Sequence, residues 1–295
     1  MRIFITGATG FIGAAVIPEL IAAGHQPLGL ARSDEGAAAL EAIGAEVHRG
    51  SLEDLDSLAS GAKSADAVIH LAFNHDFSKL EENCETDRRA IETLGAALAG
   101  SGRPFLVTSG TAVAFAPGRL STEDDAPNAP FPRVASEHAA LALAKQGVRV
   151  SVVRLPQVHD PEKQGLISYL IAAARERGVS AYVGDGRNRW PAAHRLEVAR
   201  LYRLALEKGS AGVRYNAVAE EGVPLRAIAE AIGRGLKLPV VSIAAEEAGA
   251  HFGWLGAFAA ADIPASSALT RERLGWLPTG PDLMSDLARA RDFAA

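Results

Sequence analysis

The fold is decided by the first stretch of the chain, Arg2-Ile3-Phe4-Ile5-Thr6-Gly7-Ala8-Thr9-Gly10-Phe11-Ile12-Gly13. The apolar run at residues 3–5 predicts a short buried strand, and the apolar spacing after Gly13 predicts a helix. Gly7 allows a sharp turn, Gly10 leaves room for a pyrophosphate beside backbone N–H groups, and Gly13 allows close packing of helix on strand. The stretch therefore predicts a dinucleotide cradle. The alternative is a glycine turn that packs a strand against a helix without a ligand.

Strands and helices then alternate along the first half of the chain. The expected strands cover residues 26–31, 46–48, 66–70, 104–108 and 148–154, and the expected helices cover residues 34–43, 80–99 and 134–146. Such alternation is typical of an α/β protein with a doubly wound parallel sheet, the Rossmann architecture.

The second half of the chain has a looser pattern. Pro156 cannot continue a strand ladder, so it marks where the chain leaves the sheet. We expect a dinucleotide-binding domain over residues 1–156, rejoined by a strand near residues 213–216, and a smaller, mainly substrate-binding cap over residues 157–295. The cap is expected to contain helices at residues 166–177, 196–206 and 225–233.

The composition of the chain limits the kinds of molecule that the protein is expected to bind. The 295 residues are 48% hydrophobic and carry a net charge of −5, which gives no footprint for nucleic acid or an anionic membrane. A small-molecule substrate is expected. The single cysteine, Cys84, excludes an internal disulfide and a multi-cysteine metal site, and no metal is expected. Because the first strand begins at residue 2, we expect no leader segment and a cytoplasmic protein.

The residues after the second strand bear on the choice of cofactor. Arg32 and Ser33 stand where an acid would accept the ribose hydroxyl of NAD. A guanidinium with a hydroxyl suits the 2′-phosphate of NADP instead, so NADP is expected. Asp34 keeps NAD possible, and the alternative for Arg32 is a solvated loop charge.

Five motifs carry a family resemblance: residues 6–13, 68–72, 107–111, 154–156 and 193–199. With them the chain resembles the short-chain dehydrogenase/reductase superfamily, in its extended, epimerase/dehydratase-like branch. The resemblance implies a catalytic Tyr-x-x-x-Lys pair, which is missing. The chain has four tyrosines, Tyr169, Tyr182, Tyr202 and Tyr215. The residues four positions after them are Ala173, Gly186, Leu206 and Ala219, and none of these is a lysine.

Aligning Glu137 with the family's acidic residue puts Ala129 at the tyrosine position and Arg133 at the lysine position. Arg133 can hold ribose hydroxyls or phosphate, but it cannot relay protons. Asp87 takes the position at which the family usually has an asparagine. The chain therefore resembles the atypical subset that keeps the cofactor fold and loses the usual catalytic residues. The expected cofactor-binding residues are Thr6, Gly7, Thr9, Gly10, Phe11, Ile12, Gly13, Arg32, Ser33, Leu52, Leu71, Ala72, Phe73, Thr108, Arg133 and Pro156.

Four residues are candidates for the missing chemistry. His75, next to Asp76, is the first candidate proton donor, and His159 is the second. The alternative for His75 is a solvated loop histidine. Ser109 and Thr111 flank Gly110, which takes the position of the family's catalytic hydroxyl, and we expect them to orient a substrate oxygen. Their alternative role is to satisfy backbone groups at the strand end.

Trp190 and His194 are candidate substrate residues, because a flat aromatic face and an imidazole suit a pocket wall. The alternatives are a core anchor for Trp190 and a structural hydrogen bond for His194. The later aromatic residues Phe252, Trp254 and Phe258 are expected to be packing residues.

The expected function is that of an NADP-dependent oxidoreductase, with hydride transfer to a carbonyl or C=N group of a small organic substrate. An iminium arrives already protonated and needs less of the missing acid. The alternatives are a non-catalytic NADP(H) sensor and an epimerase or dehydratase with a tightly held cofactor. A homodimer is expected, since in the family the helices at residues 80–99 and 134–146 often pair across a dimer axis.

Overall fold

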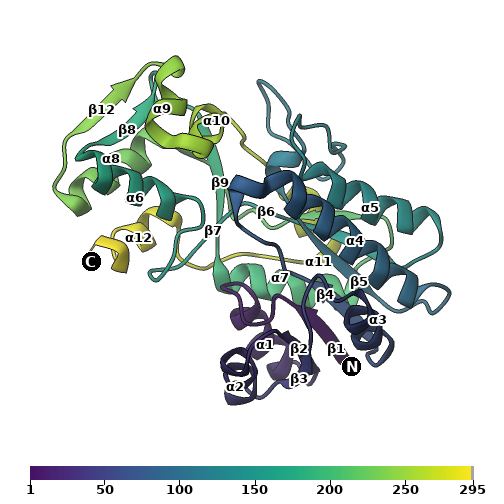
Figure 1. The fold of residues 1–295 in the computed structure, drawn as a ribbon. Helices are drawn as coiled ribbons and strands as arrows, with labels where there is room; N and C mark the ends of the chain where they lie inside the picture. Colours follow the sequence, from purple (N-terminus) through teal and green to yellow (C-terminus); the bar gives the residue numbers. More distant parts are fainter. Residues whose placement is uncertain (294–295) are drawn as a thin grey trace.

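A seven-stranded parallel sheet forms the centre of the computed structural model, which describes residues 1–293 (Figure 1). Its strand order is β10-β6-β5-β4-β1-β2-β3, and every neighbouring pair is parallel. The strands are β1 (Arg2–Thr6), β2 (Gln26–Ala31), β3 (Glu46–Arg49), β4 (Ala67–His70), β5 (Phe105–Gly110), β6 (Val150–Leu155) and β10 (Arg214–Asn216). The expected doubly wound Rossmann sheet is confirmed, and β10 is the strand that returns to it.

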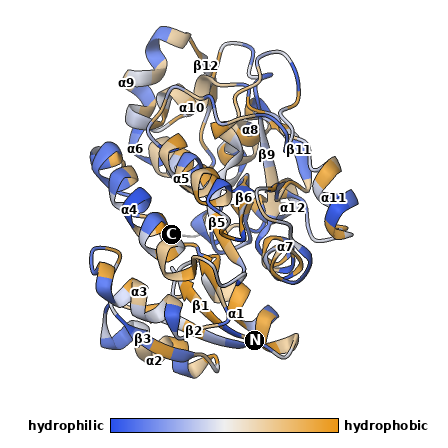
Figure 2. Ribbon diagram, turned by 90° about the vertical axis from the view of Figure 1, so that its right-hand side faces the viewer, coloured by the Kyte–Doolittle hydropathy of each residue, from blue (hydrophilic) through white to orange (hydrophobic). Residues whose placement is uncertain are grey.

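Helices cover both faces of this sheet. One face carries α1 (Gly13–Ala22), α2 (Asp34–Ala42), α7 (Arg195–Lys208) and α11 (Ala268–Leu274); the other carries α3 (Leu55–Lys63), α4 (Leu80–Leu98) and α5 (Val134–Lys145). The sequence of β1 is apolar at residues 3–5 because both faces of this strand are buried. Ile3 and Ile5 pack into the core on the first face and Phe4 into the core on the second, and all three are fully buried. Figure 2 shows the strands β1 and β2 as an apolar centre.

The cap contains strands that the sequence pattern did not predict. A three-stranded sheet is formed by β7 (Gln157–His159), β9 (Arg189–His194) and β11 (Glu220–Pro224), and a two-stranded sheet by β8 (Ser180–Val183) and β12 (Val240–Ile243). Around them lie α6 (Ile167–Arg177), α8 (Leu225–Leu236), α9 (Ala248–Phe252), α10 (Gly256–Ala260) and α12 (Leu283–Leu287). The strands are three to six residues long, too short for an alternation to show, and β9 and β11 also contain charged residues and a proline.

Pro156 lies between β6 of the central sheet and β7 of the cap, so the chain leaves the sheet where expected. Short 3₁₀ helices complete the chain: η1 (Phe77–Lys79), η2 (Thr111–Val113), η3 (Ala245–Glu247), η4 (Gly253–Leu255) and η5 (Arg291–Phe293). Among the described residues there is no helix with the length and apolar character needed to cross a membrane.

Candidate cofactor and active site

The glycine turn between β1 and α1 has the geometry of an anion cradle. Gly7 has a φ of 69°, and a Cβ added there would lie 2.6 Å from the backbone nitrogen of Ala72. A Cβ at Gly10 would meet only the carbonyl oxygen of Gly7, so the space beyond Gly10 is open. Within the described part of the chain, the backbone N–H groups of Phe11 and Ile12 have no protein acceptor. These donors at the start of a helix suit a phosphate group.

Behind the cradle, a buried chain of hydrogen bonds joins the ends of β1 and β4 to α4. The Ala72 N–H donates to Thr6 Oγ1 (3.3 Å), and Thr6 Oγ1 lies 2.7 Å from His70 Nδ1. His70 Nε2 lies 3.0 Å from Asp87 Oδ1. Each atom finds a partner if Thr6 donates to Nδ1 and the imidazole donates from Nε2, and we assign that tautomer from the network. The network holds the two loops that form the cradle at a fixed separation.

Asp87 is the centre of this network. Its carboxylate accepts hydrogen bonds from His70, Ser136 and Arg133, and it is almost fully buried. Burial alone would raise the pKa of Asp87, but the charge of Arg133 and the hydrogen bonds from His70 and Ser136 outweigh it. The pKa of Asp87 therefore lies well below its usual range. Sequence reasoning identified Asp87 only as a departure from the family pattern.

Arg133 is engaged mainly with the protein. It donates to Asp87, to the Ser136 hydroxyl and to the backbone oxygen of Thr108, and its guanidinium lies 4.0 Å from the ring centroid of Phe73. Three of the five guanidinium N–H groups are thus used. Two N–H groups remain for the expected contact with the ribose. The main contacts of Arg133 connect β5, α4 and α5.

Two arginines flank the carboxyl ends of β2 and β3. Arg32 follows β2, is exposed, and makes no hydrogen bond or ion pair within the described range. Arg49 ends β3, opposite Ala31, and binds Asp34 at 2.7 Å. The carboxylate that kept NAD possible is therefore paired with a cation, while Arg32 is open.

Ser33 and Leu52 have local structural roles at the same edge. The Ser33 hydroxyl oxygen caps α2 by accepting from the Gly36 N–H at 3.1 Å, as its position before the helix indicates. Leu52 lies in the loop after β3 and packs, half-buried, against the core on the α3 and α4 face.

The hydroxyls after β5 divide into two groups. Thr108 Oγ1 lies 2.7 Å from the hydroxyl of Tyr202 on α7, so this hydroxyl is engaged with the protein and is not free for the cofactor contact that we expected. Thr111 makes only a long contact of 3.4 Å with the Leu155 oxygen. Ser109 Oγ is buried and has no partner among the described residues. Burial leaves this hydroxyl without a hydrogen bond that would replace its contact with water, so no group in the described part of the chain fixes its direction.

His75 is less suited to donate a proton than its sequence context indicates. It lies in the loop after β4, partly open to solvent, with ring contacts to Phe73 (5.3 Å) and Phe77 (6.0 Å). Partial desolvation, followed by the charges of Arg133 and Lys163, lowers the pKa of His75. At neutral pH the imidazole is neutral, so it accepts a proton more readily than it donates one.

His159 and His194 belong to a buried cluster in the cap. His159 is fully buried, and its Nδ1 lies 2.8 Å from Asp286 on α12. His194 Nδ1 accepts from the Leu196 N–H at 3.2 Å and so caps α7. The two rings lie 5.8 Å apart. This placement supports structural roles for both residues and gives His159 no access to a substrate.

Trp190 is not at a pocket wall. It lies fully buried in the core of the cap, and its Nε1 donates to the Phe258 oxygen at 3.1 Å. Phe252 and Phe258 are half-buried against the same core, as expected. Trp254 packs on Phe77 and Tyr169 instead of in this core, and 41% of its surface is exposed. Its position next to Phe77, 177 residues earlier in the chain, carries no signal in the sequence.

The sheet order, the glycine cradle and the network behind it define a dinucleotide-binding α/β protein. A sequence model of the NAD dependent epimerase/dehydratase family matches residues 3–218, and the chain belongs to this family. The extended short-chain dehydrogenase/reductase resemblance is thereby confirmed.

Two fungal relatives match over nearly their whole length. The chain is 50% identical over 290 residues to the uncharacterized protein C2A9.02 of Schizosaccharomyces pombe, with 98% of each chain covered. It is 44% identical over 292 residues to the uncharacterized protein YLL056C of Saccharomyces cerevisiae, with 97% of this chain and 98% of the relative covered.

Solved structures share the fold at lower identity. A dTDP-glucose 4,6-dehydratase from Streptomyces venezuelae, DesIV, solved with NAD and TYD bound, superposes with a TM-score of 0.79 at 20% identity. The match covers 99% of this chain and 96% of that one. The residues of the cradle fit such a dinucleotide, because Gly10 leaves open space beside the free N–H groups of Phe11 and Ile12.

Proposed function

We propose that this protein is an NADP-dependent reductase that transfers a hydride to a carbonyl or C=N group of a small organic substrate. The observation that carries the proposal is the unpaired, buried Ser109 hydroxyl at the carboxyl end of β5. That end lies at the same sheet edge as the cradle, since β5 pairs in parallel with β4 and β4 with β1. The Ser109 Oγ exposes less than 1 Å² of surface, so the proposal includes a turn of this side chain toward the substrate when the site is occupied.

The cofactor preference rests on Arg32. The cradle at Gly7, Gly10 and Gly13 would hold the pyrophosphate, and Arg32 would meet the 2′-phosphate of NADP. Asp34 is the group that would compete for the ribose, and its carboxylate lies 2.7 Å from Arg49 in an exposed ion pair. An exposed arginine beside a paired acid favours the doubly charged phosphate over a hydroxyl.

When bound, NADPH supplies the hydride. The protein's own part is to orient the acceptor: Ser109 and Thr111 can donate hydrogen bonds to its oxygen or nitrogen. Ala129 at the tyrosine position supplies no acid, and the lowered pKa of His75 makes its imidazole a weak candidate for one. This arrangement favours acceptors that need little protonation, such as an iminium or an activated aldehyde.

Steady-state NADPH oxidation with matched ketones, aldehydes and cyclic imines at neutral pH tests the proposal. We expect turnover with at least one class, and Ser109→Ala is expected to lower kcat/KM about a hundredfold, the effect of removing one oriented donor. Ser242→Ala, which removes a hydroxyl on β12 in the cap, serves as the matched control and is expected to leave the rate unchanged.

Binding of NADPH without oxidation by any acceptor would instead establish a nucleotide-sensing protein. An equal rate in Ser109→Ala and wild type would remove the assigned role of the Ser109 hydroxyl.

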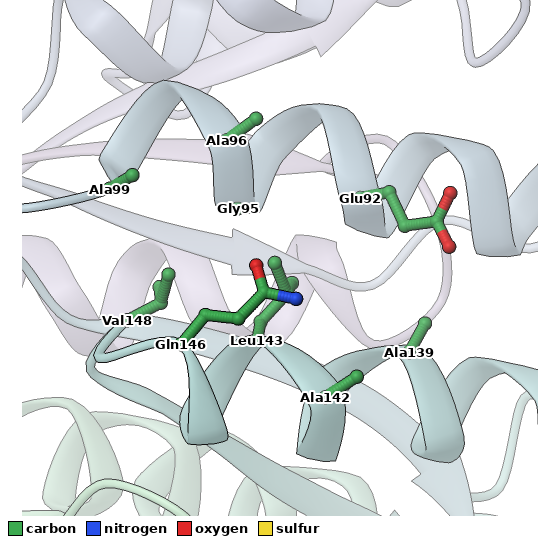
Figure 3. A pocket seen from close by; sticks show the side chains of 9 residues that line it. All are labelled: Glu92, Gly95, Ala96, Ala99, Ala139, Ala142, Leu143, Gln146 and Val148. Carbon is green, nitrogen blue, oxygen red and sulfur yellow. The ribbon is translucent and has the colours of Figure 1, made fainter.

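We further propose that the protein forms a homodimer through α4 and α5. A hollow of about 250 Å³ lies between these helices and is lined mainly by small side chains (Figure 3). Gly95 and Ala96 on α4 and Ala139 and Ala142 on α5 line the hollow, and small residues allow close approach of another helix pair. Light scattering is expected to give twice the chain mass; a monomer at micromolar concentration would refute the dimer.

A further inference from the structure

Aromatic side chains from two parts of the fold meet beside the cofactor site. Phe77 of η1 stacks on Trp254 of η4, with ring centroids 3.9 Å apart and planes 13° apart. Tyr169 of α6 contacts both rings edge-on, at 5.2 Å from Trp254 and 6.1 Å from Phe77. We call Phe73, His75, Phe77, Tyr169 and Trp254 the aromatic cluster. It bridges the loop after β4 and the cap.

The aromatic cluster is continuous with the cofactor cradle. His75 contacts Phe73 on one side and Phe77 on the other. Phe73 in turn lies under the guanidinium of Arg133 and directly follows Ala72, whose backbone touches Gly7. The rings therefore lead from the cradle edge to the surface of the cap. In Figure 1 the start of α4, which follows η1, faces the cap.

Two members of the aromatic cluster are more exposed than packing requires. Trp254 is 41% exposed and Tyr169 is 42% exposed, whereas Trp190 and Trp276 are fully buried. These two rings lie beside the candidate cofactor site and offer apolar faces that a ligand can cover.

A cation stands near the same surface. Lys163, in the loop before α6, is exposed and makes no ion pair among the described residues. Its ammonium lies 5.9 Å from the Phe11 ring, and its charge contributes to the lowered pKa of His75. Lys163 therefore lies between the cradle and the aromatic cluster.

We propose that the aromatic cluster is the substrate site and that it selects planar aromatic substrates with an anionic group. The ring stacks on Trp254 and Tyr169, and Lys163 meets the anionic group. This inference rests on the proposed function, because it names the class of substrate that the proposed reductase would reduce. The binding itself does not depend on turnover.

Calorimetric titration of the NADP⁺-saturated protein tests the proposal without catalysis. Three probes separate ring from charge: trans-cinnamate is planar and anionic, 3-cyclohexylpropanoate is anionic and saturated, and cinnamyl alcohol is planar and uncharged. We expect cinnamate to bind about tenfold more tightly than either of the other two, since aromatic contact and a charge-assisted hydrogen bond each contribute on the order of 1 kcal/mol.

Variants assign the contacts. Trp254→Leu and Tyr169→Leu are expected to weaken cinnamate binding about tenfold, and Trp254→Phe is expected to retain most of it. Lys163→Ala is expected to weaken cinnamate but not cinnamyl alcohol. Tyr182→Leu removes a ring on β8, outside the aromatic cluster, and is the matched control.

Tryptophan fluorescence provides an independent readout, because Trp254 is the exposed one of three tryptophans. A shift in emission when cinnamate binds to the Tyr169→Leu or wild-type protein places the probe at Trp254. Equal affinity for cinnamate and cyclohexylpropanoate, or unchanged cinnamate binding in Trp254→Leu, would overturn the proposal. Tight cinnamate binding in a protein that oxidises no NADPH would refute the reductase and leave the site standing.

Discussion

Arg133 donates to the carboxylate of Asp87 across the gap between α5 and α4, at an N–O distance of 2.5 Å. In the family pattern the same two positions hold a lysine and an asparagine. Here the two positions hold a nearly buried ion pair whose carboxylate also accepts from His70 and Ser136. The pair links α5 to α4 beside the candidate cofactor site.

Removing one charge of this pair is expected to cost stability. Asp87→Asn leaves the Arg133 guanidinium without its counter-ion, and the loss is expected to be about 3 kcal/mol in urea unfolding followed by circular dichroism. Adding Arg133→Met should recover most of it, because both buried charges are then gone. A double variant no more stable than Asp87→Asn would show that the ion pair is not the cause.

The ion pair of Asp87 and Arg133 also predicts that the stability of the fold depends on pH. Since the pKa of Asp87 is lowered in the folded state, its contribution is present above the unfolded value, near pH 4, and is lost as the pH falls below it. The stability difference between wild type and Asp87→Asn should therefore shrink in acid. Unfolding curves at a series of pH values measure this difference; one that stays constant down to the acid transition would contradict the assignment.

The burial of His159 predicts that the stability of the fold also depends on pH in a higher range. Burial lowers the pKa of its imidazole, although the carboxylate of Asp286 opposes this. The unfolded chain therefore binds more protons, and stability is lost as the pH falls through about 6.5. His159→Gln should flatten the stability curve between pH 7 and 5, as measured by thermal unfolding. A curve as steep as that of wild type would place the sensitivity elsewhere.

Arg32 is expected to decide between the two dinucleotides. Arg32→Ala should raise the Kd for NADP⁺ about tenfold or more, because one charge-assisted phosphate contact is lost, and should leave the Kd for NAD⁺ nearly unchanged. Titration calorimetry measures both constants. Arg187→Ala, which removes an exposed arginine of the cap, is the control. Equal weakening of both cofactors would mean that Arg32 does not face the 2′-phosphate.

The cradle glycines are expected to separate binding from folding. A Cβ at Gly10 meets only the Gly7 oxygen, at a tight 3.1 Å, so Gly10→Ala should lower the melting temperature less than Gly7→Ala and should abolish measurable NADP⁺ binding. Gly7→Ala should lower both, because φ is 69° and the Cβ would overlap Ala72. Normal NADP⁺ affinity in Gly10→Ala would exclude this turn as the phosphate site.

Local patterns accounted for the parts of the fold that depend on neighbours in sequence. The apolar run before Gly7, the serine cap at Ser33 and the returning strand at residues 214–216 each carry a signal within a few residues. The short cap strands carry no such signal, because β9 owes its place to pairing with β7 and β11.

Side-chain roles at the site depend on partners far away in sequence. The hydroxyl of Thr108 is engaged by Tyr202, 94 residues later, and His159 is tied to Asp286, 127 residues later. No spacing rule predicts such contacts. The stacking of Phe77 on Trp254 is of the same kind, which is why Trp254 was expected to be a packing residue.

The central claim is that the chain reduces a substrate with NADPH although it lacks the family's tyrosine and lysine. Product mass after reaction with NADPH that carries deuterium at both hydrogen positions of the nicotinamide C4 tests it most directly. We predict that an aromatic aldehyde or imine gains one deuterium and that NADP⁺ accumulates in equal amount. NADPH that binds while no acceptor gains deuterium, or a product formed without net cofactor oxidation, would contradict the claim.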